Sequence, residues 1–152
     1  MKRLLLLAVA LSVVACTGEI AGLGPPSDPA TETFASSLGV NLAAMTKTPD
    51  GLYYRDLSVG NGPVLAHDTT VTVNYSGYLT DGTLFDSGTN SHFATSTLVA
   101  GFREGLIGMR VNGRRQLVIP SALGYGATGS LPAIPRQATL VFVVQLVSID
   151  SI

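Results

Sequence analysis

The feature that most constrains the fold is a series of strand patterns separated by turn signals from Gly51 onward. Residues 52–59 and 116–119 predict strands, and Pro120 ends the second because proline cannot donate to a strand ladder. Apolar and polar residues alternate over residues 71–76, which predicts a strand with one buried face. The Asp81-Gly82 pair predicts a hairpin turn into a further strand over residues 83–86.

Two more patterns complete this part of the chain. Phe102, Leu106 and Met109 recur at helical spacing, which predicts a short helix with a buried stripe over residues 101–109. Residues 139–149 are almost continuously apolar and rich in valine, which predicts a long final strand. Strands therefore dominate, and the sequence predicts an α+β fold in which an antiparallel sheet wraps one short helix.

The N-terminal segment has the pattern of a targeting sequence. Lys2 and Arg3 precede an apolar run over residues 4–14, which is shorter than the roughly 20 residues that span a bilayer. We therefore expect a signal peptide over residues 1–15. The run ends in VVAC at residues 13–16, which resembles a bacterial lipobox, so Cys16 is the expected lipidation site. The alternative is a free cysteine beside an ordinary cleavage site.

Residues 16–50 are expected to link this anchor to a domain over residues 51–150. The Gly- and Pro-rich residues 24–29 indicate a flexible or polyproline-like linker. Apolar residues at helical spacing over residues 34–45 indicate a short amphipathic helix resting on the domain, and an ordered strap without function is the preferred interpretation. A lipid-anchored product would be extracytoplasmic, and the Thr17 that follows Cys16 favours the outer membrane.

The composition excludes several classes of function. The chain has 152 residues with nine basic and ten acidic side chains, and without Lys2 and Arg3 the balance is seven to ten. A net charge of about −3 argues against a nucleic-acid binder, and Arg110, Arg114 and Arg115 are interpreted as a solvated face. With a single cysteine and two distant histidines, neither a disulfide nor a zinc site is expected, and no motif indicates a metal or a cofactor.

Six short motifs follow one another in the predicted domain. They are VNYSGYL at residues 73–79, DGTLFDS at 81–87, GFREGL at 101–106, YGATG at 125–129, IP at 134–135 and ATLVF at 138–142. In this order and at this spacing they resemble an FKBP-type peptidyl-prolyl isomerase domain. The resemblance covers residues 51–149 and implies a half-barrel sheet around a short helix, which agrees with the strand and helix patterns.

The resemblance also implies roles for individual residues. The prolyl pocket would be lined by Tyr75, Phe85, Phe93, Leu98, Val99, Phe102 and Phe142. Asp86 would be a buried acceptor inside it, the Tyr125 hydroxyl would donate to the substrate, and the Ile134 N–H would hold a neighbouring carbonyl. Asp86, Tyr125 and Phe142 are the expected catalytic set.

Three departures from the family pattern qualify this expectation. Phe102 stands where relatives often carry tryptophan, the stretch between Phe93 and Leu98 is shorter than usual, and residues 130–133 differ from common forms. The expected function is isomerisation of X-Pro bonds in extracytoplasmic proteins, with proline-containing polypeptides and family macrolides as ligands. The alternative is a proline-peptide binding module with little turnover. The short stretch between Tyr125 and Thr139 leaves no room for an inserted chaperone domain, and a monomer is expected.

Overall fold

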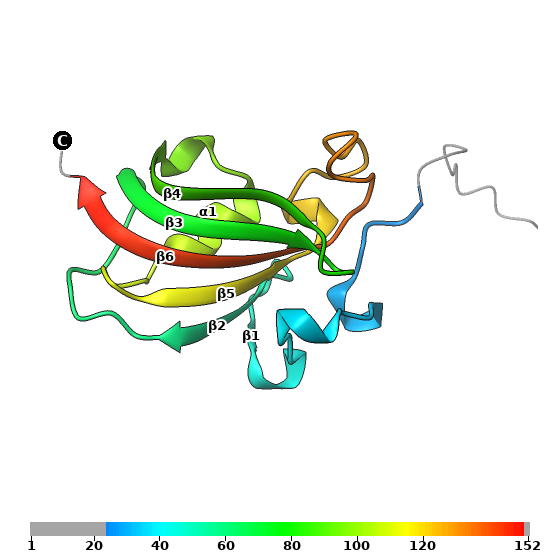
Figure 1. Cartoon of the computed structure of the whole chain (residues 1–152), viewed down its shortest axis with the longest axis horizontal. Helices are drawn as coiled ribbons and strands as arrows, with labels where there is room; N and C mark the ends of the chain where they lie inside the picture. Colours follow the sequence, from blue (N-terminus) through cyan, green and yellow to red (C-terminus); the bar gives the residue numbers. More distant parts are fainter. Residues whose placement is uncertain (1–23, 151–152) are drawn as a thin grey trace, which may run out of the picture.

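The protein, a computed structural model that describes residues 24–150, forms one six-stranded antiparallel sheet curved around a short helix (Figure 1). The predicted signal peptide and Cys16 lie outside the described residues. Across the sheet the strands run in the order β1-β2-β5-β6-β3-β4. Their bounds are β1 Thr46–Lys47, β2 Tyr53–Ser58, β3 Thr70–Leu79, β4 Leu84–Ala94, β5 Arg114–Ile119 and β6 Leu140–Asp150, and helix α1 is Ala100–Leu106. The predicted α+β class is confirmed.

The strand predictions are close to the observed bounds except at β4. That strand was expected over residues 83–86 but continues to Ala94. Its second half is polar, so the sequence carries no alternation there. Asn74 supports this half from β3, because its side-chain oxygen accepts a hydrogen bond from the Asn90 N–H at 2.8 Å where the register shifts. The predicted hairpin turn is confirmed, with Gly82 at φ +91°.

The two faces of the sheet bury different side chains. On β5 and β6 the residues Leu117, Ile119 and Phe142 face helix α1, and their neighbours Val118 and Val141 face the opposite side. This division follows from the period of two along a strand. The helix face carries the main core, whereas the second face carries a small cluster around Tyr53, Val118 and Val141.

Helix α1 packs against strand β5 through a glycine. A side-chain carbon at Gly105 would sit 2.6 Å from Leu117 Cδ1, so a larger residue would force the buried Leu117 side chain to shift. Arg115 reaches from β5 to the end of the helix and donates to the carbonyls of Gly105 and Ile107. It also binds Asp56 through two hydrogen bonds of 2.7 and 3.2 Å. Arg115 is therefore buried, and interpreting it as part of a solvated face was wrong.

The N-terminal part of the described chain covers the second face of the sheet. The amphipathic helix expected over residues 34–45 is absent, and two 3₁₀ turns, Ser36–Leu38 and Leu42–Ala44, stand in its place. Gly39, in the left-handed region at φ +60°, separates them. The apolar residues of the pattern still pack on the sheet: they are Phe34, Leu38, Leu42 and Met45. We call residues 34–45 the strap.

The segment that precedes the strap is bonded to the domain as well. Residues 24–32, which include the expected flexible or polyproline-like linker, make several hydrogen bonds to residues 121–139 and so lie against the domain. Strand β1 also joins the sheet before the expected domain start at Gly51. Among residues 24–150, no helix has both the length and the apolar character needed to cross a membrane.

Candidate active site

Five aromatic rings converge on the helix face of the sheet. The Phe102 and Phe142 ring centroids lie 4.9 Å apart at an interplanar angle of 79°. The Phe85 ring meets Phe142 edge to face at 5.5 Å, and Tyr75 contacts Phe93 and Phe102 at 5.8 and 6.1 Å. Edge-to-face pairs stabilise such an arrangement beyond the area they bury. The structure thus brings together the aromatic residues that the sequence predicted as one lining.

The burial of these rings decreases from the inside of the cluster outward. Phe102 and Phe142 are only 4% and 6% exposed and form its floor. The half-buried residues around them are Tyr75, Phe85, Phe93, Leu98 and Val99. A buried aromatic floor with a partly exposed apolar rim suits an apolar ring entering from solvent.

Gly77 makes the packing of this floor possible. It lies on β3 opposite Phe142 of β6 and Asp86 of β4. A side-chain carbon at this position would stand 2.6 Å from both the Phe142 and the Phe85 ring, well inside van der Waals contact. This role of Gly77 was not predicted, although a glycine inside an alternating strand pattern indicates a close approach of another chain segment.

A hydrogen bond joins the aromatic cluster to a carboxylate. The Tyr75 hydroxyl donates to Asp86 Oδ2 at 2.9 Å. Burial, followed by this hydrogen bond and the Asp86 charge, raises the pKa of Tyr75 to about 12, and the Tyr125 hydroxyl adds a smaller effect. Tyr75 is therefore a neutral donor at physiological pH. Asp86 accepts this hydrogen bond, but its side chain is exposed, so the prediction that the acceptor is buried was wrong.

The other two predicted polar groups lie on the loop between β5 and β6. Tyr125 is 39% exposed. Ile134 is buried, but its N–H already donates to the Ser130 carbonyl at 2.9 Å. An antiparallel bridge between Ser130 and Ile134 closes the loop tip. The Ile134 N–H that was expected to hold a neighbouring carbonyl is thus engaged within the loop.

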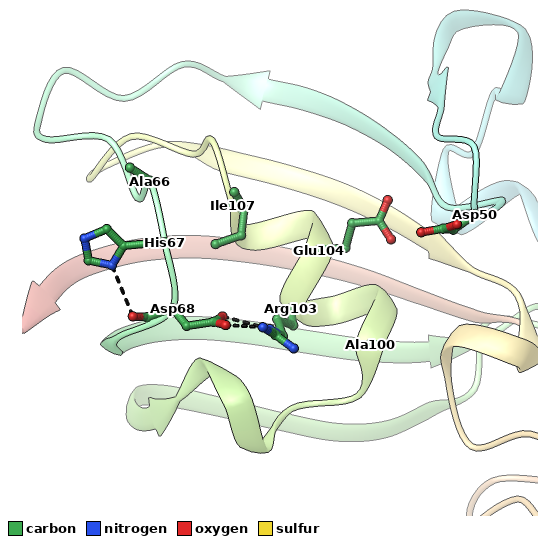
Figure 2. A pocket seen from close by; sticks show the side chains of 8 residues that line it. All are labelled: Asp50, Ala66, His67, Asp68, Ala100, Arg103, Glu104 and Ile107. Carbon is green, nitrogen blue, oxygen red and sulfur yellow. Dashed lines mark hydrogen bonds and ion pairs between the residues drawn. The ribbon is translucent and has the colours of Figure 1, made fainter.

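A separate cleft of about 460 Å³ lies on the outer side of helix α1 (Figure 2). It is lined by Asp50, Ala66, His67, Asp68, Ala100, Arg103, Glu104 and Ile107. Asp68 and Arg103 form an ion pair along one side, and the Arg103 hydrogen bond is the main cause that lowers the pKa of Asp68. None of the five aromatic rings lines this cleft. Its charged walls do not suit an apolar ring, so we place the site at the aromatic cluster.

Comparison with known proteins decides the family. A sequence model described as FKBP-type peptidyl-prolyl cis-trans isomerase matches residues 62–147. The chain belongs to this family. It is 38% identical over 105 residues to an FK506-binding protein of Neisseria meningitidis serogroup B, covering 65% of this chain and 96% of the relative. It is also 41% identical over 110 residues to FK506-binding protein 4 of Dictyostelium discoideum, covering 70% of this chain and only 30% of that longer protein.

Solved structures of FKBP-type proteins share the fold. A peptidyl-prolyl cis-trans isomerase of Pseudomonas syringae superposes with a TM-score of 0.68 at 29% identity, covering 76% of this chain and 87% of that one. FkpA of Escherichia coli superposes with a TM-score of 0.66 at 37% identity, covering 70% of this chain and 52% of that one. In this FKBP domain, the Phe102 that replaces the common tryptophan packs edge to face against both Phe142 and Tyr75.

Proposed function

We propose that this FKBP-family chain accelerates cis/trans rotation of X-Pro bonds in extracytoplasmic proteins. The aromatic cluster with its Phe102 and Phe142 floor is the observation that supports this activity most directly. The prolyl ring is apolar and rigid, and the half-buried aromatic rim over the buried floor is a surface suited to a ligand of that kind. Family membership supports the same proposal.

The chemistry requires no nucleophile and no general base. Amide resonance sets a rotation barrier of about 18–20 kcal/mol, and the uncatalysed reaction takes tens to hundreds of seconds. The planar amide is more polar at its carbonyl than the twisted transition state, which has lost the resonance. Transfer into an apolar aromatic site therefore disfavours the planar form more than the twisted one. Such differential binding lowers the barrier.

The polar groups at the rim would orient the bound chain. Asp86 holds the Tyr75 hydroxyl at 2.9 Å, which fixes this ring at the wall of the site. The exposed Tyr125 hydroxyl is available to donate to a substrate carbonyl. The Ile134 N–H would contribute only after exchange of its bond to Ser130. Tyr125 is thus the donor that we expect to act first.

A proline-limited refolding assay tests the proposal. The full chain should accelerate the slow phase, and Asp86→Ala or Tyr125→Phe should each lower kcat/KM about tenfold, as expected for loss of one hydrogen bond to a bound group. Tyr78→Phe, in the cluster on the opposite face, is the matched control and should keep full activity. The residue assignments fail if both site variants fold and retain the rate of the unaltered chain.

The alternative is a proline-peptide binding module with little turnover, and the Phe102 floor is the observation that favours it. A protease-free isomerisation assay separates the two functions. Tight binding of a proline peptide without acceleration, together with a gain of rate in Phe102→Trp, would favour the binding module. Acceleration by the unaltered chain would exclude it.

The cellular location is part of the proposal and is supported by the sequence of residues 1–16. A charged start, an apolar run and VVAC ending at Cys16 favour export and lipidation of this cysteine. More than one acyl chain on the protein would anchor it stably to a membrane. Labelling of cells with radioactive palmitate should mark the unaltered chain but not Cys16→Ala. Equal labelling of both would refute the anchor.

A further inference from the structure

The loop that carries Tyr125 and Ile134 is tied at both ends to the N-terminal segment. We call residues 121–139 the site loop and residues 24–32 the clasp. Ser121 begins the site loop and Thr139 ends it, and both side chains are buried. In Figure 1 the clasp, in blue, passes the same end of the sheet as the orange site loop. The contacts between them join residues that lie about a hundred positions apart in sequence.

Ser27 makes the central contact of the clasp. Its backbone N–H donates to Ser121 Oγ at 2.8 Å, and its own Oγ accepts the Ser121 N–H at 2.8 Å. The Ser27 hydroxyl also lies 2.8 Å from the Thr139 hydroxyl. One side chain therefore bonds both ends of the site loop, and its removal would leave a buried N–H of Ser121 without that acceptor.

Two further contacts reinforce this connection. The Thr139 hydroxyl donates to the Glu32 carboxylate at 2.6 Å, the short distance expected of a charge-assisted bond. The Gln137 amide bridges the two segments, since its oxygen accepts from Ser121 Oγ and its nitrogen donates to the Gly24 carbonyl, each at 2.9 Å. Five residues of the two segments thus form one continuous hydrogen-bonded network with Ser27.

Gln137 also fixes the conformation of the site loop around Tyr125. Its backbone lies in the left-handed region at φ +55°, which is unfavourable for a residue other than glycine or asparagine. Its N–H crosses the loop to the Gly126 carbonyl at 2.9 Å, and the Gly126 N–H returns to the Ser121 carbonyl. The bonds from Ser121 and Gly24 hold the Gln137 side chain and so support this backbone conformation.

We propose that the clasp is a positioning element of the site and that Ser27 is its principal positioning residue. Ser27 does not touch the aromatic cluster and acts through Ser121 and Thr139 on the loop that presents Tyr125. This inference rests on the proposed isomerase function. As a consequence, the clasp controls the fraction of molecules whose site loop is in the conformation that contacts substrate.

The expected effect falls on substrate binding. A looser site loop reduces the fraction of molecules that can bind, and apparent affinity falls by that fraction. Ground state and transition state contact the same loop, so kcat should change little. A loss of global stability alone would leave KM unchanged in conditions where the protein stays folded.

The test compares three variants of the full chain in the isomerisation assay and by hydrogen exchange. Ser27→Ala should raise KM about fivefold and speed exchange at the Gly126 and Gln137 amides, whereas Ser27→Thr, which keeps the hydroxyl, should restore both. Leu42→Ala is the matched control, because it weakens the strap on the second face without touching the network. It should leave KM and both amides unchanged.

The outcomes separate this inference from the proposed function. Unchanged KM and exchange in Ser27→Ala, or an equal rise of KM in Leu42→Ala, would overturn the role of the clasp. If Ser27→Ala does not fold, Glu32→Ala removes a contact of a half-exposed side chain and should still raise KM about twofold; an unchanged KM there refutes the proposal. If the unaltered chain proves inactive, the proposed isomerase function is refuted. The positioning role of the clasp is then tested by hydrogen exchange at the Gly126 and Gln137 amides alone.

Discussion

The two faces of the sheet use the same strands for different purposes. The helix face buries a continuous core that runs from Leu106 and Leu117 to the aromatic floor of the site. Among the described residues, the second face buries the smaller apolar cluster of Tyr53, Val118 and Val141 beneath the strap. Neighbouring residues on β5 and β6 therefore belong to different clusters, because successive side chains along a strand point to opposite faces of the sheet.

The two faces of the sheet therefore contribute differently to folding and to the binding site. The helix face combines the main core with the site, so changes there affect both folding and binding. The strap covers apolar side chains that would otherwise be exposed, and it also accepts a hydrogen bond from Gln116, whose amide donates to the Leu38 carbonyl at 2.7 Å. We therefore expect the strap to add stability while contributing little to the aromatic cluster.

The largest effect should come from Leu117→Ala on the helix face. Leu117 is fully buried against Gly105, and its truncation leaves a cavity that the closely packed helix cannot fill. The free energy of unfolding should fall by about 4 kcal/mol, and by about 2 kcal/mol for Val118→Ala, the adjacent residue on the strap face. Urea denaturation measures both. Equal losses at the two positions would contradict the division between a main core and a covering strap.

A smaller effect is expected from Asp56→Ala, which removes the partner of a buried charge. Arg115 is held by Asp56 at 2.7 Å and lies over the Tyr54 ring, 4.6 Å from its centroid. Losing one member of a buried ion pair costs about 3–5 kcal/mol, but Asp56 is exposed, so we expect about 2 kcal/mol because water screens the pair. Thermal unfolding measures the loss.

The double variant Asp56→Ala/Arg115→Met is the control for this experiment. It removes the orphaned charge together with its partner and should recover part of the lost stability. A double variant no more stable than Asp56→Ala would show that Arg115 acts mainly through its bonds to the Gly105 and Ile107 carbonyls at the end of helix α1.

Local patterns predicted most of the fold, because a half-buried strand requires alternating residues and a tight turn requires particular residue types. Alternation located β3, and Asp81-Gly82 located the hairpin. The strap departed from its helical pattern because Gly39 adopts a left-handed conformation and the apolar side chains gain more by following the sheet surface than by completing helical turns. Tertiary contact overrode local periodicity there.

The site was predictable in its residue types but not in its exposure or bonding. The motifs brought together the aromatic cluster, whose convergence the structure shows. Asp86 lies exposed on β4, although the motif implied a buried position, and a motif does not record the exposure of a side chain. The burial of Arg115 and the bonds of Ser27 depend on partners about 60 and 100 residues away, and no local pattern records such pairs.

The smallest effect concerns the ionisation of Tyr75. Its pKa is raised to about 12 in the folded protein, so above pH 10 the unfolded chain loses this proton while the folded protein keeps it. The contribution of Tyr75 to stability is complete below pH 10 and should decline as the pH rises toward 12.

Ultraviolet titration of tyrosinate should show one late phenol that is absent in Tyr75→Phe. In Asp86→Asn this phenol should titrate earlier yet remain above its ordinary range, because burial is the larger cause of the shift. If Tyr75 titrates at the same pH in Asp86→Asn as in the unaltered protein, its hydroxyl does not donate to Asp86. This hydrogen bond would then not fix the Tyr75 ring at the wall of the site.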